Sequence, residues 1–253
     1  MGSNNIEHSS ESEEYTVLVE PKIVKYLRYF VIFVLLASIV WVMRGLEYGV
    51  TPGDILQEHF FYFFFIMTTL VYMSLPYLVQ RGLGYAADRR LVIAIAFFFI
   101  AGPFLGQAFN LFEYIPWWDK MLHLVSGAIL ALIAFSLIPV INVSAKEVLK
   151  VSPLFAALFA FCFAVMGGVF WEIGEYLIDW AFGTNMQCWA DDPTLLWTGR
   201  TEQGAGLIDT MEDLMACAIG AFIASAVGYR YLSRGKKFIG VKKIRNGNGK
   251  NNK

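Results

Sequence analysis

Residues 118–139 read WDKMLHLVSGAILALIAFSLIP, and this stretch decides the fold. Asp119 and His123 lie in its first two helical turns, and nearly everything after them is apolar. A helix of about 20 apolar residues is long enough to cross the hydrocarbon core of a bilayer. The stretch therefore predicts a membrane-spanning helix that carries ionisable side chains just inside one of its ends.

Five further apolar segments have a similar length, at about 26–43, 60–80, 91–112, 153–179 and 206–231. Only 16% of the 253 residues are charged and 57% are hydrophobic, whereas a soluble domain has about 25% charged residues. The first segment lacks a signal-peptide cleavage pattern and is expected to stay in the protein. The sequence predicts an all-α, multi-pass membrane protein built as a bundle of six transmembrane helices.

The charged residues divide the chain into three parts. Residues 1–21 are rich in Ser and Glu and are predicted to be a disordered acidic tail, 22–233 form the six-helix domain, and 234–253 form a disordered basic tail. With six spans, both termini lie on one side of the membrane. That side holds 17 of the 20 Lys and Arg, and the other holds Arg44, Lys120 and Arg200. Positive residues concentrate in the cytoplasm, so both termini are predicted to be cytoplasmic.

Polar residues in the later spans are predicted to lie at a common depth near the outer membrane edge. Counted from the cytoplasmic edge at about 1.5 Å per residue, four of them lie roughly 24–27 Å deep in hydrocarbon about 30 Å thick. These four are Gln107, His123, Glu172 and Asp213. Six others continue the layer outward: Asn110, Glu113, Asp119, Glu175, Asp179 and Asp209.

The ionisable residues of the last three spans also share helix faces with Gly and Ala. The stripes are Asp119, His123, Gly127, Ala131 and Ala134; Ala157, Ala160, Ala164, Gly168, Glu172, Glu175 and Asp179; and Asp209, Asp213, Ala216, Gly220, Ala224 and Gly228. Small residues mark the faces where membrane helices pack closely. The acids and the histidine are therefore expected to meet inside the bundle, away from lipid.

Several carboxylates cannot share a small volume while all are ionised, so either protons or a cation must neutralise them. Carboxylates and imidazole are ligands for divalent metals, here Zn²⁺, Mg²⁺ or Mn²⁺. The predicted ligands are His123, Glu172, Asp213 and Asp119. Glu175, as general base, and Asp209 are the predicted catalytic residues. The corresponding function is metal-assisted chemistry on a lipid or lipid-linked phosphate, with membrane lipids as partners and no nucleic acid.

Two other functions fit the same residues. The acids could form the relay of a proton- or cation-coupled transporter, although few polar residues continue through the cytoplasmic half of the spans. The cluster could also be purely structural, in a non-enzymatic membrane scaffold or resistance protein. The three cysteines predict no disulfide framework, and Cys188 is predicted to be a free thiol.

Two motifs carry a resemblance to known families: Asp119-Lys120-x-x-His123, and Asp209-Thr210-x-x-Asp213-Leu214 followed by Gly220-Ala221. With Trp171-Glu172-x-x-Glu175, they resemble the YjdF-type family of uncharacterised bacterial inner-membrane proteins. They are more distantly similar to VanZ-like proteins, which are associated with glycopeptide resistance. Leu124 and Cys217 depart from the VanZ-like pattern, which has an aromatic residue and an asparagine there. The resemblance implies a multi-pass protein of the bacterial inner membrane and supplies no reaction.

Overall fold

The computed structural model describes residues 15–16, 18–47, 52–144, 151–192, 196, 202–239 and 242–244. Most of these residues are helical. The helices are α1 (Lys22–Glu47), α2 (Pro52–Leu83), α3 (Arg89–Phe99), the π-helical η1 (Ile100–Ala108), α4 (Leu111–Tyr114), α5 (Trp118–Ser144), α6 (Pro153–Phe182) and α7 (Ala205–Ser233). Six helical segments in the described chain are long and apolar enough to cross a membrane. The predicted six-helix membrane bundle is confirmed.

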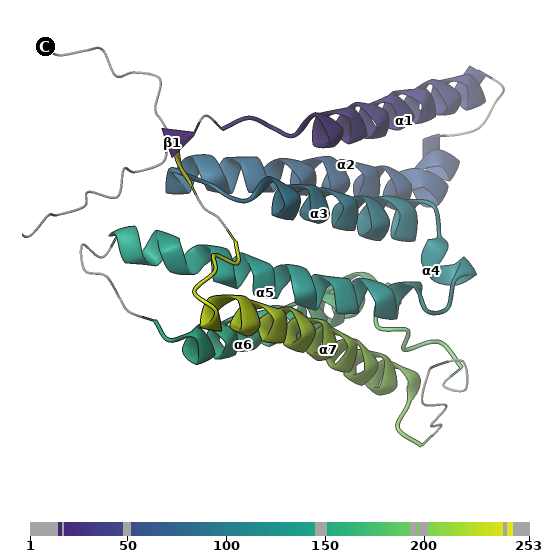
Figure 1. Cartoon of the computed structure of the whole chain (residues 1–253). Helices are drawn as coiled ribbons and strands as arrows, with labels where there is room; N and C mark the ends of the chain where they lie inside the picture. Colours follow the sequence, from purple (N-terminus) through teal and green to yellow (C-terminus); the bar gives the residue numbers. More distant parts are fainter. Residues whose placement is uncertain are drawn as a thin grey trace, which may run out of the picture.

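The helices form two groups that lie side by side (Figure 1). In the first, α1, α2 and α3 with η1 enclose bulky side chains such as Ile66, Met73 and Phe104. In the second, α5, α6 and α7 pack around buried alanines. The two groups meet mainly where α3 and η1 contact α5. The second group carries the ionisable residues, so its packing determines the geometry of the site.

Helices α5, α6 and α7 approach closely because their shared faces carry small side chains. Ala131, Ala160 and Ala221 are fully buried. A Cβ atom placed on Gly127 would lie 2.0 Å from the backbone oxygen of Cys217, so only glycine fits there. The structure thus buries the small-residue stripes that the sequence predicts, and it buries Glu172, Glu175 and Asp179 with them on α6.

The third span differs from its prediction. It was expected to continue as one helix to about residue 112, but η1 ends at Ala108 and Asn110 adopts a left-handed conformation with φ 56°. Pro103 lies inside η1 and has no N–H to donate to the preceding turn, a usual cause of helix distortion. As a result Asn110 and Glu113 are exposed, and they do not join the buried acids of α5, α6 and α7.

Three short strands gather at the end of the bundle opposite the ionisable residues. Strand β3 (Lys242–Ile244) pairs in parallel with β1 (Tyr15–Thr16) and antiparallel with β2 (Tyr85–Ala86). The sheet joins residues 15–16 and 242–244 to the connection between α2 and α3, so these two segments lie at one end of the bundle. Strands β1 and β3 lie within the two stretches that the sequence assigns to the tails.

Candidate functional site

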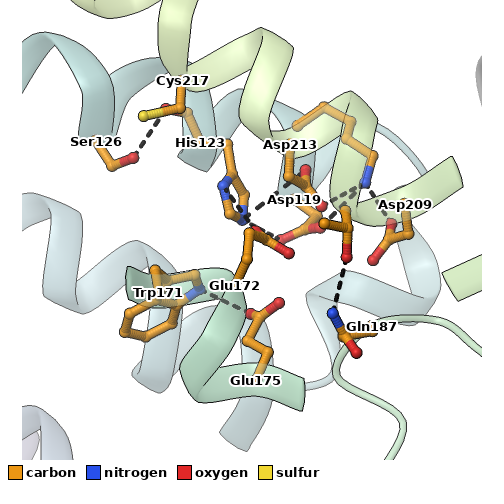
Figure 2. Close-up of polar contacts among 12 residues, drawn as sticks. Asp119, His123, Ser126, Trp171, Glu172, Glu175, Gln187, Asp209, Asp213 and Cys217 are labelled. Atoms are coloured by element: carbon orange, nitrogen blue, oxygen red, sulfur yellow. Dashed lines mark hydrogen bonds and ion pairs between the residues drawn. The ribbon is translucent and has the colours of Figure 1, made fainter. Parts of the chain in front are cut away.

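His123 stands at the centre of the site, one turn into α5. It is 6% exposed and three carboxylates surround its ring (Figure 2). Its Nε2 lies 3.7 Å from Asp119 Oδ1 and 3.8 Å from Asp213 Oδ1, and its Nδ1 lies 3.6 Å from Glu172 Oε1. All three distances exceed those of hydrogen bonds. The three carboxylates face the imidazole without bonding to it directly.

These spacings suit ligands that share one ion. Asp119, His123 and Asp213 can each offer one ligand atom, and the three atoms lie within 4.8 Å of one another. Ligands about 2.0–2.2 Å from a single tetrahedral metal ion are roughly 3.3–3.6 Å apart. The three side chains therefore need only small movements to coordinate one cation.

Lys120 extends from α5 to α7 and pairs with two buried aspartates. Its Nζ lies 2.8 Å from Asp213 Oδ2, makes a shorter contact with Asp209 Oδ1, and lies 3.4 Å from Asp119 Oδ2. Lys120 is 3% exposed, Asp209 is 1% exposed and Asp213 is fully buried. A buried carboxylate is costly unless it is paired, so Lys120 compensates part of the negative charge of the site.

Helix α6 contributes two glutamates with different surroundings. Glu172 faces His123, whereas Glu175 Oε1 accepts a hydrogen bond of 2.7 Å from Trp171 Nε1 on the same helix (Figure 2). Both glutamates are less than 9% exposed. Their spacing of three residues brings both to one face of α6. Of these two glutamates, Glu172 is the one whose carboxylate lies beside the imidazole.

Several buried oxygen atoms of the site have no hydrogen-bond partner among the described residues. They are both carboxylate oxygens of Glu172, Oδ1 of Asp213 and Oδ2 of Asp209. Buried polar atoms in folded proteins are nearly always hydrogen-bonded, so an unpartnered group often marks a site for an ion or another ligand. Here the unpartnered oxygens of Asp213 and Glu172 are the ones directed toward His123.

The connection between α6 and α7 is tied down beside the site. The carboxylate of Asp179 accepts hydrogen bonds from the backbone N–H groups of Met186 (2.8 Å) and Gln187 (2.9 Å) and from the Thr184 hydroxyl. The Gln187 side chain then donates to Thr210 Oγ1 of α7 at 2.8 Å (Figure 2). Residues 184–187 thus hold the C-terminal end of α6 and the N-terminal end of α7 together.

The structure brings together five of the six predicted site residues: Asp119, His123, Glu172, Asp209 and Asp213. Glu175 is buried nearby but bonds to Trp171. Lys120 was not predicted as a site residue, since it entered only the count of positive residues and the Asp119-Lys120-x-x-His123 motif; the burial of Glu212, which is 2% exposed, was not predicted either. Lys120 precedes His123 by three residues, so helical spacing could have placed it on the same side of α5.

Comparison with known proteins identifies the family and leaves the reaction open. No solved structure matches this chain. An uncharacterized protein of Thermotoga maritima is 25% identical over 155 residues, which cover 61% of this chain and 70% of the relative. A family model described as "Predicted membrane protein (DUF2238)" matches residues 27–234, which include every residue of the site. The chain therefore belongs to the DUF2238 family of membrane proteins.

Proposed function

We propose that this protein binds one divalent cation at the outer end of the bundle, between α5, α6 and α7. Asp119, His123 and Asp213 are the ligands in this proposal, and Glu172 is a fourth. The observation that carries it is the approach of three ligand atoms to within 4.8 Å of one another, on side chains that are not hydrogen-bonded to each other.

The charge of the site supports a cation. Asp119, Glu172, Asp209 and Asp213 lie together in a largely buried cluster, and Lys120 is their partner of fixed positive charge within the described residues. Burying uncompensated carboxylates costs several kcal/mol each, roughly, even after relaxation. A divalent cation would remove most of the excess. Carboxylate and imidazole ligands together suit Zn²⁺ and Mn²⁺, and less often Mg²⁺.

The proposed chemistry is metal-assisted reaction of a lipid or lipid-linked phosphate. The positive-inside pattern directs the site to the outer face of the bacterial inner membrane, at the depth of lipid headgroups. A bound cation there would polarise a phosphoryl oxygen or activate water. Asp209, paired with Lys120, and Glu175, held by Trp171, are the residues proposed to assist it. The similarity to VanZ-like proteins is part of this proposal. The motifs that carry the similarity include the proposed ligands Asp119, His123 and Asp213.

A transport path is less well supported. A relay requires polar groups that continue across the membrane. In the described part of α5–α7, the buried polar side chains of the half nearer the termini are Ser136 and Ser225. Ser136 donates its hydroxyl hydrogen to the backbone oxygen of Ile133. The buried ionisable residues of α5–α7 thus lie at one end of the bundle, and the other half offers few polar groups for a path across the membrane.

The test is metal content together with thermal unfolding of the purified protein in detergent. Elemental analysis after dialysis against Zn²⁺ or Mn²⁺ should find one ion per chain, and a chelator should lower the melting temperature. Asp213→Asn should lose the ion and this dependence on the metal. Glu113→Gln, which changes an exposed acid at the same end of the bundle, is the matched control and should retain both. Absence of a bound ion, with an identical melting curve in chelator, would refute the proposal.

A further inference from the structure

The Lys120 ammonium contacts carboxylates of the protein itself, which a role in binding substrate does not explain. An ammonium group has three hydrogens to donate, and three carboxylates lie around Nζ, those of Asp119, Asp209 and Asp213. The side chain is 3% exposed. The described contacts account for all three hydrogens, so Lys120 acts inside the protein as a fixed positive charge.

Asp213 separates two positions in the pocket. Its Oδ2 lies 2.8 Å from Lys120 Nζ, while its Oδ1 lies 3.8 Å from His123 Nε2. One carboxylate therefore faces an ammonium with one oxygen and the proposed cation position with the other. In proteins with two-metal sites the two cations lie about 3.5–4 Å apart, so two cations can occupy neighbouring positions such as these.

Glu172 is an independent reason to assign the divalent cation to the side of Asp213 that faces His123. Its side chain is 4% exposed, and Oε1 lies 3.6 Å from His123 Nδ1. Among the described residues neither of its oxygens has a partner that meets hydrogen-bond geometry, although the Thr210 hydroxyl of α7 lies beside the carboxylate. Figure 2 shows its carboxylate beside the imidazole. The unpartnered oxygens of Glu172 and Asp213 thus lie on the histidine side, whereas the ammonium lies on the side of Asp209.

We infer that the Lys120 ammonium occupies the second cation position of this pocket, so that the protein binds one divalent cation and not two. This inference rests on the proposed metal site. Four carboxylates surround the pocket: Asp119, Glu172, Asp209 and Asp213. One ammonium and one divalent cation leave a single negative charge. Without the ammonium, two divalent cations would balance the same carboxylates, with Asp209 and Asp213 as ligands of the second.

The experiment measures bound Mn²⁺ per chain in the full-length protein and in Lys120→Met, which keeps the length of the side chain and removes its charge. Lys120→Arg keeps the charge and is the matched control. We expect one ion in the wild type and in Lys120→Arg, and two in Lys120→Met. Electron paramagnetic resonance of Lys120→Met should show two spin-coupled Mn²⁺ ions, a signal that a merely structural role would not produce.

The outcomes separate this inference from the proposed function. If the wild type binds no ion, the proposed metal site fails. If the wild type binds one ion and folded Lys120→Met also binds one or none, the site stands and the role of Lys120 is refuted. If Lys120→Met does not fold even when purified with MnCl₂, Lys120→Met/Asp209→Asn removes both charges of the pair. This double variant should bind one ion, and either two ions or none in it would overturn the inference.

Discussion

The backbone oxygen of Leu124 on α5 packs directly against Gly220 on α7. It occupies the space that a Cβ atom at position 220 would need, so only glycine fits there. A Cβ on Gly220 would be 1.8 Å from that oxygen and 3.2 Å from the backbone nitrogen of Ala128. The obstacle is backbone, which cannot move without shifting a helix. This contact sets the separation of α5 and α7 about two turns from Asp213, and with it the distances across the site.

The first prediction concerns that contact. Gly220→Ala should destabilise the protein by about 3 kcal/mol or more, because the added methyl group forces two closely packed helices apart. Gly174→Ala is the matched control, since nothing lies within 4 Å of a Cβ at Gly174 in α6. That substitution should be neutral or stabilising by about 0.5–1 kcal/mol. Melting temperatures in detergent measure both effects, and equal melting of the two variants would contradict the predicted close packing.

Asp179 supports the second prediction, on the connection between α6 and α7. Asp179→Ala removes the acceptor of the Met186 and Gln187 amides, at a cost of about 1–3 kcal/mol for donors left without partners. The amides of residues 186 and 187 should then exchange hydrogen for deuterium faster, by mass spectrometry. Glu202→Ala, at an exposed position, is the control and should leave the exchange unchanged. Unaltered protection in Asp179→Ala would show that other contacts hold this segment.

Helical periodicity explains why much of the site could be predicted. Residues three or four apart share a face, and the stripes of Gly and Ala identify that face as the packed one. Asp119, His123, Glu172 and Asp213 follow from this rule alone. Periodicity does not specify how far a flexible side chain reaches, so Lys120 was not predicted to belong to the site. It extends to two buried aspartates on another helix.

The third span shows the limit of counting depth along a helix. A constant rise of about 1.5 Å per residue holds for an α-helix, but Ile100–Ala108 is π-helical and contains Pro103. The carbonyl of Ala101 accepts a hydrogen bond of 3.1 Å from Trp118 Nε1 of α5. A contact between helices of this kind leaves no periodic trace in the sequence, so the early end of the span, before Asn110, was not predicted.

The third prediction concerns the thiol of Cys188, which lies between α6 and α7. Burial, together with the nearby carboxylates of Asp209 and Asp191, raises its pKa well above the ordinary range. The thiolate is the reactive form, so a charged thiosulfonate reagent should label Cys188 slowly at neutral pH and faster as the pH rises. Asp179→Ala should accelerate labelling at every pH by loosening the segment. Cys188→Ser gives the background, and fast, pH-independent labelling of the wild type would contradict the burial of this thiol.

The last prediction is the orientation of the protein in the membrane. Segments near both termini pair in one sheet, because β3 bonds to β1, so a reporter at either terminus reports the same side. Arg44, Lys120 and Arg200 are the Lys and Arg residues that the sequence assigns to the opposite side, and Lys120 is neutralised by buried aspartates. The positive charges that can resist translocation are therefore concentrated at the terminal side. A green fluorescent protein fused to the C terminus should fluoresce, and alkaline phosphatase fused there should be inactive. An active phosphatase fusion would reverse the topology and place the acidic pocket at the cytoplasmic face.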